Sequence, residues 1–140
     1  MTSMIEQTEH VLAVPDLARS VRWWREAMGF QTVFETPGWV FMALGGARLR
    51  LGECPDALPA HALGDHSYFA FFHVTDIDAL AEHLRVKGAT IRSGPADQPW
   101  GLREMAVESP DGHRFMLDRN PAGERATRDI VSREIYREMR

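Results

Sequence analysis

The feature that most limits how this chain can fold is an internal repeat, because two stretches carry the same order of structural signals. Asp16 and Asp76 each stand where a helix is expected to begin, and Gly29 and Gly88 each stand where that helix should end. Short apolar and β-branched runs separated by turn residues follow in both stretches. A repeat of this length indicates two copies of one supersecondary unit.

The first copy predicts a strand, a helix and three further strands. The opening run, His10–Val14, is apolar and β-branched, and the helix after Asp16 places Leu17, Val21, Trp24 and Met28 on one face. Trp24 is therefore expected in the core. The glycine-containing turns at 37–38 and 45–46 separate the last three predicted strands, which are Gln31–Thr36, Trp39–Leu44 and Ala47–Glu53.

The second copy predicts the same order, with a strand at 67–74, a helix from Asp76 to Gly88 and strands at 89–93, 103–108 and 113–118. Matching positions differ by about 60 residues early in the repeat and by about 66 late in it, which indicates an insertion around residues 95–101. The predicted class is α+β, with two βαβββ modules in one domain over residues 1–140. The modules are 8–53 and 67–119, and the stretch 54–66 is a linker.

Residues 120–140 form a tail in which a third helix is predicted from about residue 124. Val131, Ile135 and Met139 make a narrow apolar stripe among alternating charges. Such a helix could pack on its own domain or on a partner subunit, and the sequence leaves both possibilities open.

Composition narrows the class of protein. The chain has 140 residues, of which 44% are hydrophobic and 26% charged, so one globular domain is expected. A net charge of −4 argues against nucleic acid as the main partner. A single cysteine, Cys54, excludes an internal disulfide, and no signal peptide or membrane-spanning run is evident, so a cytoplasmic location is expected.

Three motifs carry a resemblance to a known family. These are the segment 10–24, the pair Gly29-Phe30, and the stretch 99–104 followed by 108–113. On the basis of these three motifs, the chain resembles the vicinal oxygen chelate superfamily, which includes glyoxalase I, extradiol dioxygenases and bleomycin-resistance proteins. The chain is most similar to the bleomycin-resistance proteins. The resemblance covers about residues 8–119. It implies a cupped mixed sheet enclosing a ligand site, and usually a homodimer.

The resemblance also implies metal ligands on the first and last strands of each module. The corresponding positions here carry His10, Arg50, Phe69 and Met116. Only His10 offers a suitable donor, because an arginine side chain has no acceptor for a cation and divalent ions prefer oxygen or imidazole ligands. We therefore expect no metal and no other cofactor, with a divalent metal site as the alternative.

Alternation along strands assigns the side chains to faces. Leu49, Leu51, Phe115 and Leu117 are expected to face the helices. The predicted lining of the cup mixes aromatic and cationic groups, which suits a flat apolar ligand with an anionic group. That lining consists of His10, Leu12, Arg48, Arg50, Phe69, Phe71, His73, Arg114, Met116 and Asp118.

Arg50 is the most informative member, because a buried arginine needs a partner. Asp118 or Glu104 could serve, and so could a carboxylate or phosphate on a ligand. Aromatic side chains at the rim could stack on a ligand or pack against a neighbouring subunit. The predicted ligand-binding residues are His10, Trp39, Phe41, Arg48, Arg50, Phe69, Phe71, Trp100, Arg114 and Met116.

These observations favour a non-catalytic protein that binds a small molecule, either a drug or an aromatic or anionic metabolite. Arg48 and Arg50 make the predicted cup basic, so the cationic drug bleomycin does not suit it. The alternative is a metal-dependent lyase, isomerase or dioxygenase of the glyoxalase type. A dimeric interaction module without a ligand is a third possibility.

Overall fold

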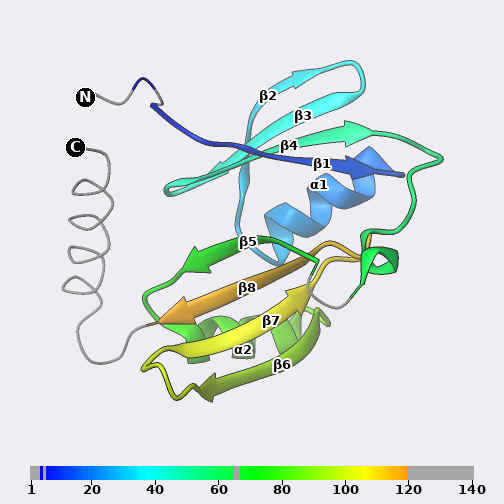
Figure 1. Cartoon of the computed structure of the whole chain (residues 1–140). Helices are drawn as coiled ribbons and strands as arrows, with labels where there is room; N and C mark the ends of the chain where they lie inside the picture. Colours follow the sequence, from blue (N-terminus) through cyan, green and yellow to red (C-terminus); the bar gives the residue numbers. More distant parts are fainter. Residues whose placement is uncertain (1–3, 5, 65–66, 120–140) are drawn as a thin grey trace.

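Each copy of the repeat forms its own four-stranded sheet in the computed structural model, which describes residues 4, 6–64 and 67–119 (Figure 1). The predicted C-terminal helix lies outside these residues. The first module contains β1 (His10–Val14), α1 (Leu17–Glu26), β2 (Gln31–Thr36), β3 (Trp39–Leu44) and β4 (Ala47–Glu53). A short 3₁₀ turn (Ala60–Leu63) precedes β5 (Tyr68–His73), α2 (Ile77–Val86), β6 (Thr90–Asp97), β7 (Arg103–Glu108) and β8 (Arg114–Arg119).

The two sheets share one topology. Their strand orders are β1-β4-β3-β2 and β5-β8-β7-β6, so the first strand of each module lies beside the last. These two strands run parallel in both modules, and the other neighbours run antiparallel. The helix and two intervening strands provide the long connection that a parallel pair needs. The predicted α+β fold of two βαβββ modules is confirmed.

Both helices begin as the sequence predicted. The carboxylate of Asp16 accepts a hydrogen bond from the backbone N–H of Arg19 at 3.1 Å, and that of Asp76 accepts one from Ala79 at 3.1 Å. Each bond satisfies an N–H group that lacks a partner within the helix. The repeat therefore extends to the capping of the helices.

One predicted boundary is wrong. The strand expected at 89–93 continues to Asp97, and the insertion expected around 95–101 is therefore partly strand. Register shifts after Ile91 and after Ser93 absorb the extra residues while β6 stays paired with β7. Bulges of this kind lengthen a strand without ending its pairing.

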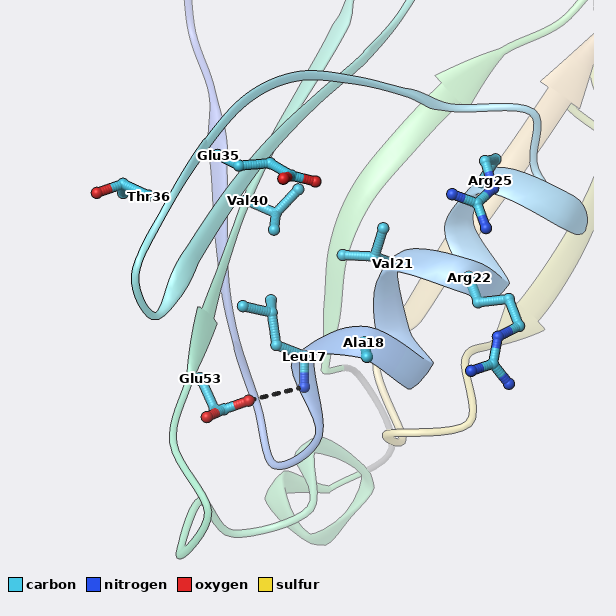
Figure 2. A pocket seen from close by; sticks show the side chains of 9 residues that line it. All are labelled: Leu17, Ala18, Val21, Arg22, Arg25, Glu35, Thr36, Val40 and Glu53. Carbon is cyan, nitrogen blue, oxygen red and sulfur yellow. Dashed lines mark hydrogen bonds between the residues drawn. The ribbon is translucent and has the colours of Figure 1, made fainter.

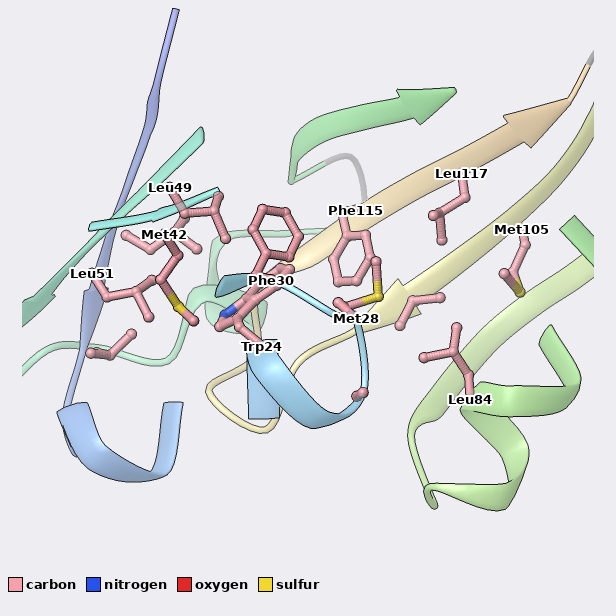
Figure 3. Packing of buried hydrophobic residues seen from close by; sticks show 14 of the residues in the cluster. Trp24, Met28, Phe30, Met42, Leu49, Leu51, Leu84, Met105, Phe115 and Leu117 are labelled. Atoms are coloured by element: carbon pink, nitrogen blue, oxygen red, sulfur yellow. The ribbon is translucent and has the colours of Figure 1, made fainter. Parts of the chain in front are cut away.

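A single hydrophobic core joins the modules. Trp24 on α1 is fully buried, and its ring lies 5.4 Å from that of Phe30 and 5.2 Å from that of Phe115 on β8 (Figure 3). The prediction that Trp24 is a core residue is confirmed. Because Phe115 belongs to the second module, the first helix packs on both halves of the molecule.

A polar contact reinforces this junction. Asp111, in the turn between β7 and β8, accepts hydrogen bonds from the Ser20 hydroxyl and, at 2.7 Å, from Arg19, both on α1. The Asp111 side chain is only 1% exposed, so these donors satisfy a carboxylate that water hardly reaches.

No helix in the described part of the chain is long and apolar enough to cross a membrane.

Candidate ligand-binding site

Strand pairing gives each sheet a core face and an open face turned away from its helix. Leu49 and Leu51 on β4, with Phe115 and Leu117 on β8, are fully buried on the core faces, as predicted. His10, however, pairs with Leu49, and Leu12 with Leu51. Paired residues point to the same side of a sheet, so the prediction that His10 and Leu12 share a face with Arg50 is wrong.

Phe69 also lies on the core side, which corrects its predicted place in the cup. The register of β5 shifts between Tyr68 and Ala70, so the ring of Phe69 packs 6.0 Å from Trp24 and 5.8 Å from Phe115. A single extra residue in a strand reverses the face of those that follow. Alternation alone could not reveal this bulge.

A cavity of about 640 Å³ lies between the modules, and it collects three of the predicted ligand-binding residues, His10, Arg48 and Phe71. His73 at the end of β5 lines it as well. Pockets for small ligands have volumes of roughly 300–1,000 Å³, so this cavity has a suitable size. We call it the inter-module pocket.

Apolar side chains form much of its wall. Phe30 comes from the first module and Phe72 from the second, and their rings lie 6.2 Å apart. His10 lies 6.4 Å from Phe72 with the rings steeply inclined. Met28, Leu44, Leu80 and Leu117 add to the apolar lining.

Arg48 is the cationic group of the inter-module pocket. Its Nη1 donates hydrogen bonds to the carbonyl oxygens of Gly45 at 2.7 Å and Ala47 at 2.9 Å, which fixes the guanidinium against the β3–β4 turn. Among the described residues, Nε and Nη2 have no hydrogen-bond acceptor. A guanidinium carries five N–H donors, so Arg48 retains donors for an anionic group.

His73 is a predicted lining residue of the cup that was not among the predicted ligand-binding residues, and it borders the inter-module pocket. Its Nδ1 lies 2.5 Å from a carboxylate oxygen of Asp118, its partner in the register of β5 and β8. The Asp118 side chain is 3% exposed, whereas that of His73 is 55% exposed. Alternation predicts that both side chains line the cup, but their contact depends on the register between two strands, because the residues lie 45 positions apart in the chain.

The open face of the first sheet holds three other predicted residues, Trp39, Phe41 and Arg50. The Arg50 guanidinium pairs with Glu9 at 2.6 Å and lies 4.4 Å from the centre of the Phe41 ring. Neither Asp118 nor Glu104 contacts it, so the predicted partners are wrong. Trp39 covers Gly52, because a Cβ there would lie 2.7 Å from the indole ring. This face presents an aromatic surface with a neutralised cation.

The open face of the second sheet holds Arg114, Met116 and, beside it, Trp100. Arg114 donates to Glu108 at 3.1 Å and to the carbonyl oxygen of Gly64 at 2.8 Å, and its side chain is only 8% exposed. Trp100 is exposed and donates its indole N–H to Glu104 at 2.7 Å. These predicted ligand-binding residues are therefore not gathered with His10, Arg48 and Phe71.

A second cavity, of about 540 Å³, lies between α1 and the end of the first sheet (Figure 2). Glu53 lines it and accepts a hydrogen bond from the backbone N–H of Leu17 at 3.2 Å. Two arginines and two glutamates stand on its rim, and it has no aromatic side chain. This groove suits a flat aromatic ligand less well than the inter-module pocket. Its residues are Leu17, Ala18, Val21, Arg22, Arg25, Glu35, Thr36, Val40 and Glu53.

The residues at the implied metal positions do not fit a metal. His10 and Phe69 lie on core faces, Arg50 is engaged with Glu9, and Met116 offers only a thioether. In the described ranges, no three histidine, cysteine, aspartate or glutamate side chains are grouped so that they could hold a metal ion. No chemical step is therefore assigned to a metal here.

The chain is similar to a protein family and to several solved structures. The family model described as "Glyoxalase/Bleomycin resistance protein/Dioxygenase superfamily" matches residues 5–117. The fosfomycin resistance protein FosX of Listeria monocytogenes superposes with a TM-score of 0.70 at 18% identity, covering 89% of this chain and 99% of FosX.

Two further solved structures have the same fold. TnmS3, an antibiotic-binding protein from Streptomyces sp. CB03234, gives a TM-score of 0.63 at 24% identity over 84% of this chain and 99% of that one. A glyoxalase/bleomycin resistance protein/dioxygenase from Nocardioides gives 0.66 at 24% identity over 89% of this chain and 90% of its own. At such identities the likeness shows a shared fold.

A curated protein matches over a short stretch. A segment of 34 residues, 24% of this chain, is 59% identical to part of L-aspartate oxidase from Yersinia pestis. The matched segment spans only 6% of that enzyme, so the match does not indicate a shared activity.

Proposed function

Because the chain belongs to the glyoxalase/bleomycin resistance protein/dioxygenase superfamily, we propose that it binds a small molecule without a metal ion. The proposed ligand has a flat apolar body and an anionic group, and it occupies the inter-module pocket. The observation that carries this proposal is the lining of that pocket, in which Phe30, Phe71 and Phe72 surround a space that Arg48 also borders.

The chemistry of the lining supports this ligand class. Aromatic walls favour a flat apolar body, and a guanidinium with free donors favours a carboxylate or phosphate. The structural likeness to TnmS3, which is described as an antibiotic-binding protein, agrees with a binding role. Binding without catalysis needs only these contacts.

Isothermal titration calorimetry with 2-naphthoate and its neutral amide tests the proposal. We expect the wild type to bind both probes and to prefer the carboxylate. Arg48→Gln should weaken naphthoate binding by about tenfold, since a hydrogen bond to a charged group is lost, and should change amide binding much less. Arg92→Gln is the matched control, because Arg92 pairs with Glu108 away from the pocket. Equal binding of naphthoate by wild type and Arg48→Gln would contradict the proposal.

A metal-dependent lyase, isomerase or dioxygenase is the competing function. Metal analysis of the purified protein separates it from binding alone. We expect no stoichiometric nickel, zinc, iron or manganese. Stoichiometric metal that disappears in His10→Ala would overturn the metal-free proposal.

We also propose that the protein is a cytoplasmic homodimer in which the open faces are covered. Several large apolar side chains on or beside these faces are exposed in the single chain. Val11 is 62% exposed and Phe34 55% on the first sheet, and Trp100 is 64% exposed beside the second. We expect an interface to cover these side chains, because large exposed apolar patches mark interaction sites.

A further inference from the structure

We propose that His73 and Asp118 are the proton-accepting pair of the inter-module pocket, and that the natural ligand carries a weakly acidic hydroxyl group, as in a phenol or an enol. This inference rests on the proposed binding function and adds the ligand's chemical class. Both residues belong to the predicted lining of the cup, although neither was among the predicted ligand-binding residues.

The tautomer of His73 follows from its partner. A neutral imidazole has one N–H donor and one acceptor nitrogen. Since Nδ1 lies 2.5 Å from a carboxylate oxygen of Asp118, the proton belongs on Nδ1. Nε2 is then an acceptor, and no described residue donates a hydrogen bond to it. His73 borders the inter-module pocket, where its side chain is 55% exposed.

Asp118 prepares His73 to take up a proton. Its carboxylate is 3% exposed and would stabilise the positive charge of an imidazolium through a charge-assisted hydrogen bond. Asp118 does not border the pocket, so it acts as a positioning residue through His73. Its neighbour across β7 and β8 is Glu104, which accepts a hydrogen bond from Trp100 at 2.7 Å.

The other charged or titratable groups around the pocket are Arg48 on β4 and His10 on β1. The guanidinium of Arg48 favours an anion in the same space. A ligand that gives its proton to His73 becomes such an anion, so the two groups act in the same direction. A neutral ligand without an acidic proton gains from neither effect.

The proton transfer is balanced and needs no other reactant. The O–H bond of the ligand breaks, its electron pair stays on the oxygen, and a new N–H bond forms at Nε2 of His73. The products are a bound phenolate or enolate and an imidazolium. A carboxylic acid is already ionised at neutral pH and has no proton to give. Phe71, whose ring lies 6.2 Å from His73 at 31°, offers a surface for the aromatic body of a phenol.

Absorbance titration with para-nitrophenol tests this step, because only its phenolate form is yellow. The matched probe is para-nitroanisole, which has the same nitrophenyl ring but a methoxy group in place of the hydroxyl, and so no acidic proton. At a pH where the free phenol is mostly protonated, we expect the wild type to bind it with the yellow colour of the phenolate. His73→Gln should lower the ratio of bound phenolate to bound phenol by about tenfold or more, and para-nitroanisole binding should stay unchanged.

Asp118→Asn provides the second variant, with circular dichroism to show that it is folded. We expect a fall of about tenfold in the same ratio, again without a change for para-nitroanisole. Asp118→Glu should restore part of the ratio, which a purely structural role would not require. Binding of both probes without any phenolate in the wild type would overturn this inference alone. If the wild type bound neither probe, the result would contradict the proposed binding function as well as this inference.

Discussion

The carboxylate of Asp111 shows how much of the junction between the modules depends on one residue. It lies in a turn of the second module and accepts hydrogen bonds from Arg19 and Ser20 on the first helix. Ser20 is 1% exposed, so its hydroxyl has no alternative partner in water. Removing the carboxylate therefore leaves a buried donor unsatisfied.

Asp111→Ala should lower the free energy of unfolding by about 2–3 kcal/mol, the cost of losing charge-assisted hydrogen bonds at a buried site. Urea denaturation monitored by circular dichroism measures this free energy of unfolding. Asp56→Ala, at an exposed carboxylate, is the control and should change stability by less than about 0.5 kcal/mol. In Ser20→Ala/Asp111→Ala the cost should be less than the sum of the single costs. Additive costs would show that the two side chains are not coupled.

His113 makes the stability of the folded protein dependent on pH. Burial lowers the pKa of His113 below its ordinary value of 6.5, although Asp111 acts weakly in the opposite direction. Below pH 6.5 the unfolded chain binds a proton that the folded chain resists binding. Stability should therefore decrease as the pH falls from 6.5 toward the lower pKa of the folded state.

Urea midpoints measured across this pH range should show a shallower dependence in His113→Gln than in the wild type. His83→Gln, at an exposed position on α2, is the control and should keep the wild-type slope. An unchanged slope in His113→Gln would mean that this imidazole does not contribute to the pH dependence.

Among the elements, β6 departs most from a regular strand, and Gly94 lies at its irregular centre. Gly94 has φ +78°, and a Cβ on it would overlap the carbonyl oxygen of Glu104 on β7. Both the backbone conformation and the close approach of β7 require glycine here.

Gly94→Ala should lower the free energy of unfolding by about 3 kcal/mol, because a left-handed backbone and a clash with backbone act together. Gly88→Ala is the matched control. Gly88 also has positive φ, +72°, but open space surrounds it, so its cost should be only about 1–2 kcal/mol. Chemical denaturation of both variants checks the difference, and equal costs would exclude a contribution from β7.

The same irregularities explain which parts of the fold the sequence could predict and which it could not. Helix caps and turn glycines are local signals, so the bounds of β2, β3 and β4 follow the prediction closely. The bulge in β5 depends on its pairing with β8, which lies far along the chain, and those in β6 depend on its pairing with β7, so alternation within either strand does not reveal them. Alternation therefore predicts the wrong face for Phe69. Alternation predicts that His73 and Asp118 both line the cup, but only the β5–β8 register shows that their side chains are in contact.

At the scale of the whole molecule, the main prediction concerns the association state. We expect the open faces of the sheets to be covered in a homodimer. Val11→Lys should shift the protein from dimer to monomer in analytical ultracentrifugation, because a buried lysine without a partner is costly in an interface. Val86→Lys is the control. Val86 is 75% exposed on α2, away from the open faces, so the variant should remain dimeric. A monomeric wild type, or a dimeric Val11→Lys, would contradict the proposed interface.

The separation of the open faces has an evolutionary consequence. Arg50, which pairs with Glu9, stands on one sheet, and His73 and Asp118 stand on the other. The shared core around Trp24 holds both sheets, whichever side chains their open faces carry. A substitution on one open face therefore leaves the fold of the other copy as it was. Because side chains of both copies line the inter-module pocket, either half can alter recognition in that shared site while the common core preserves the fold.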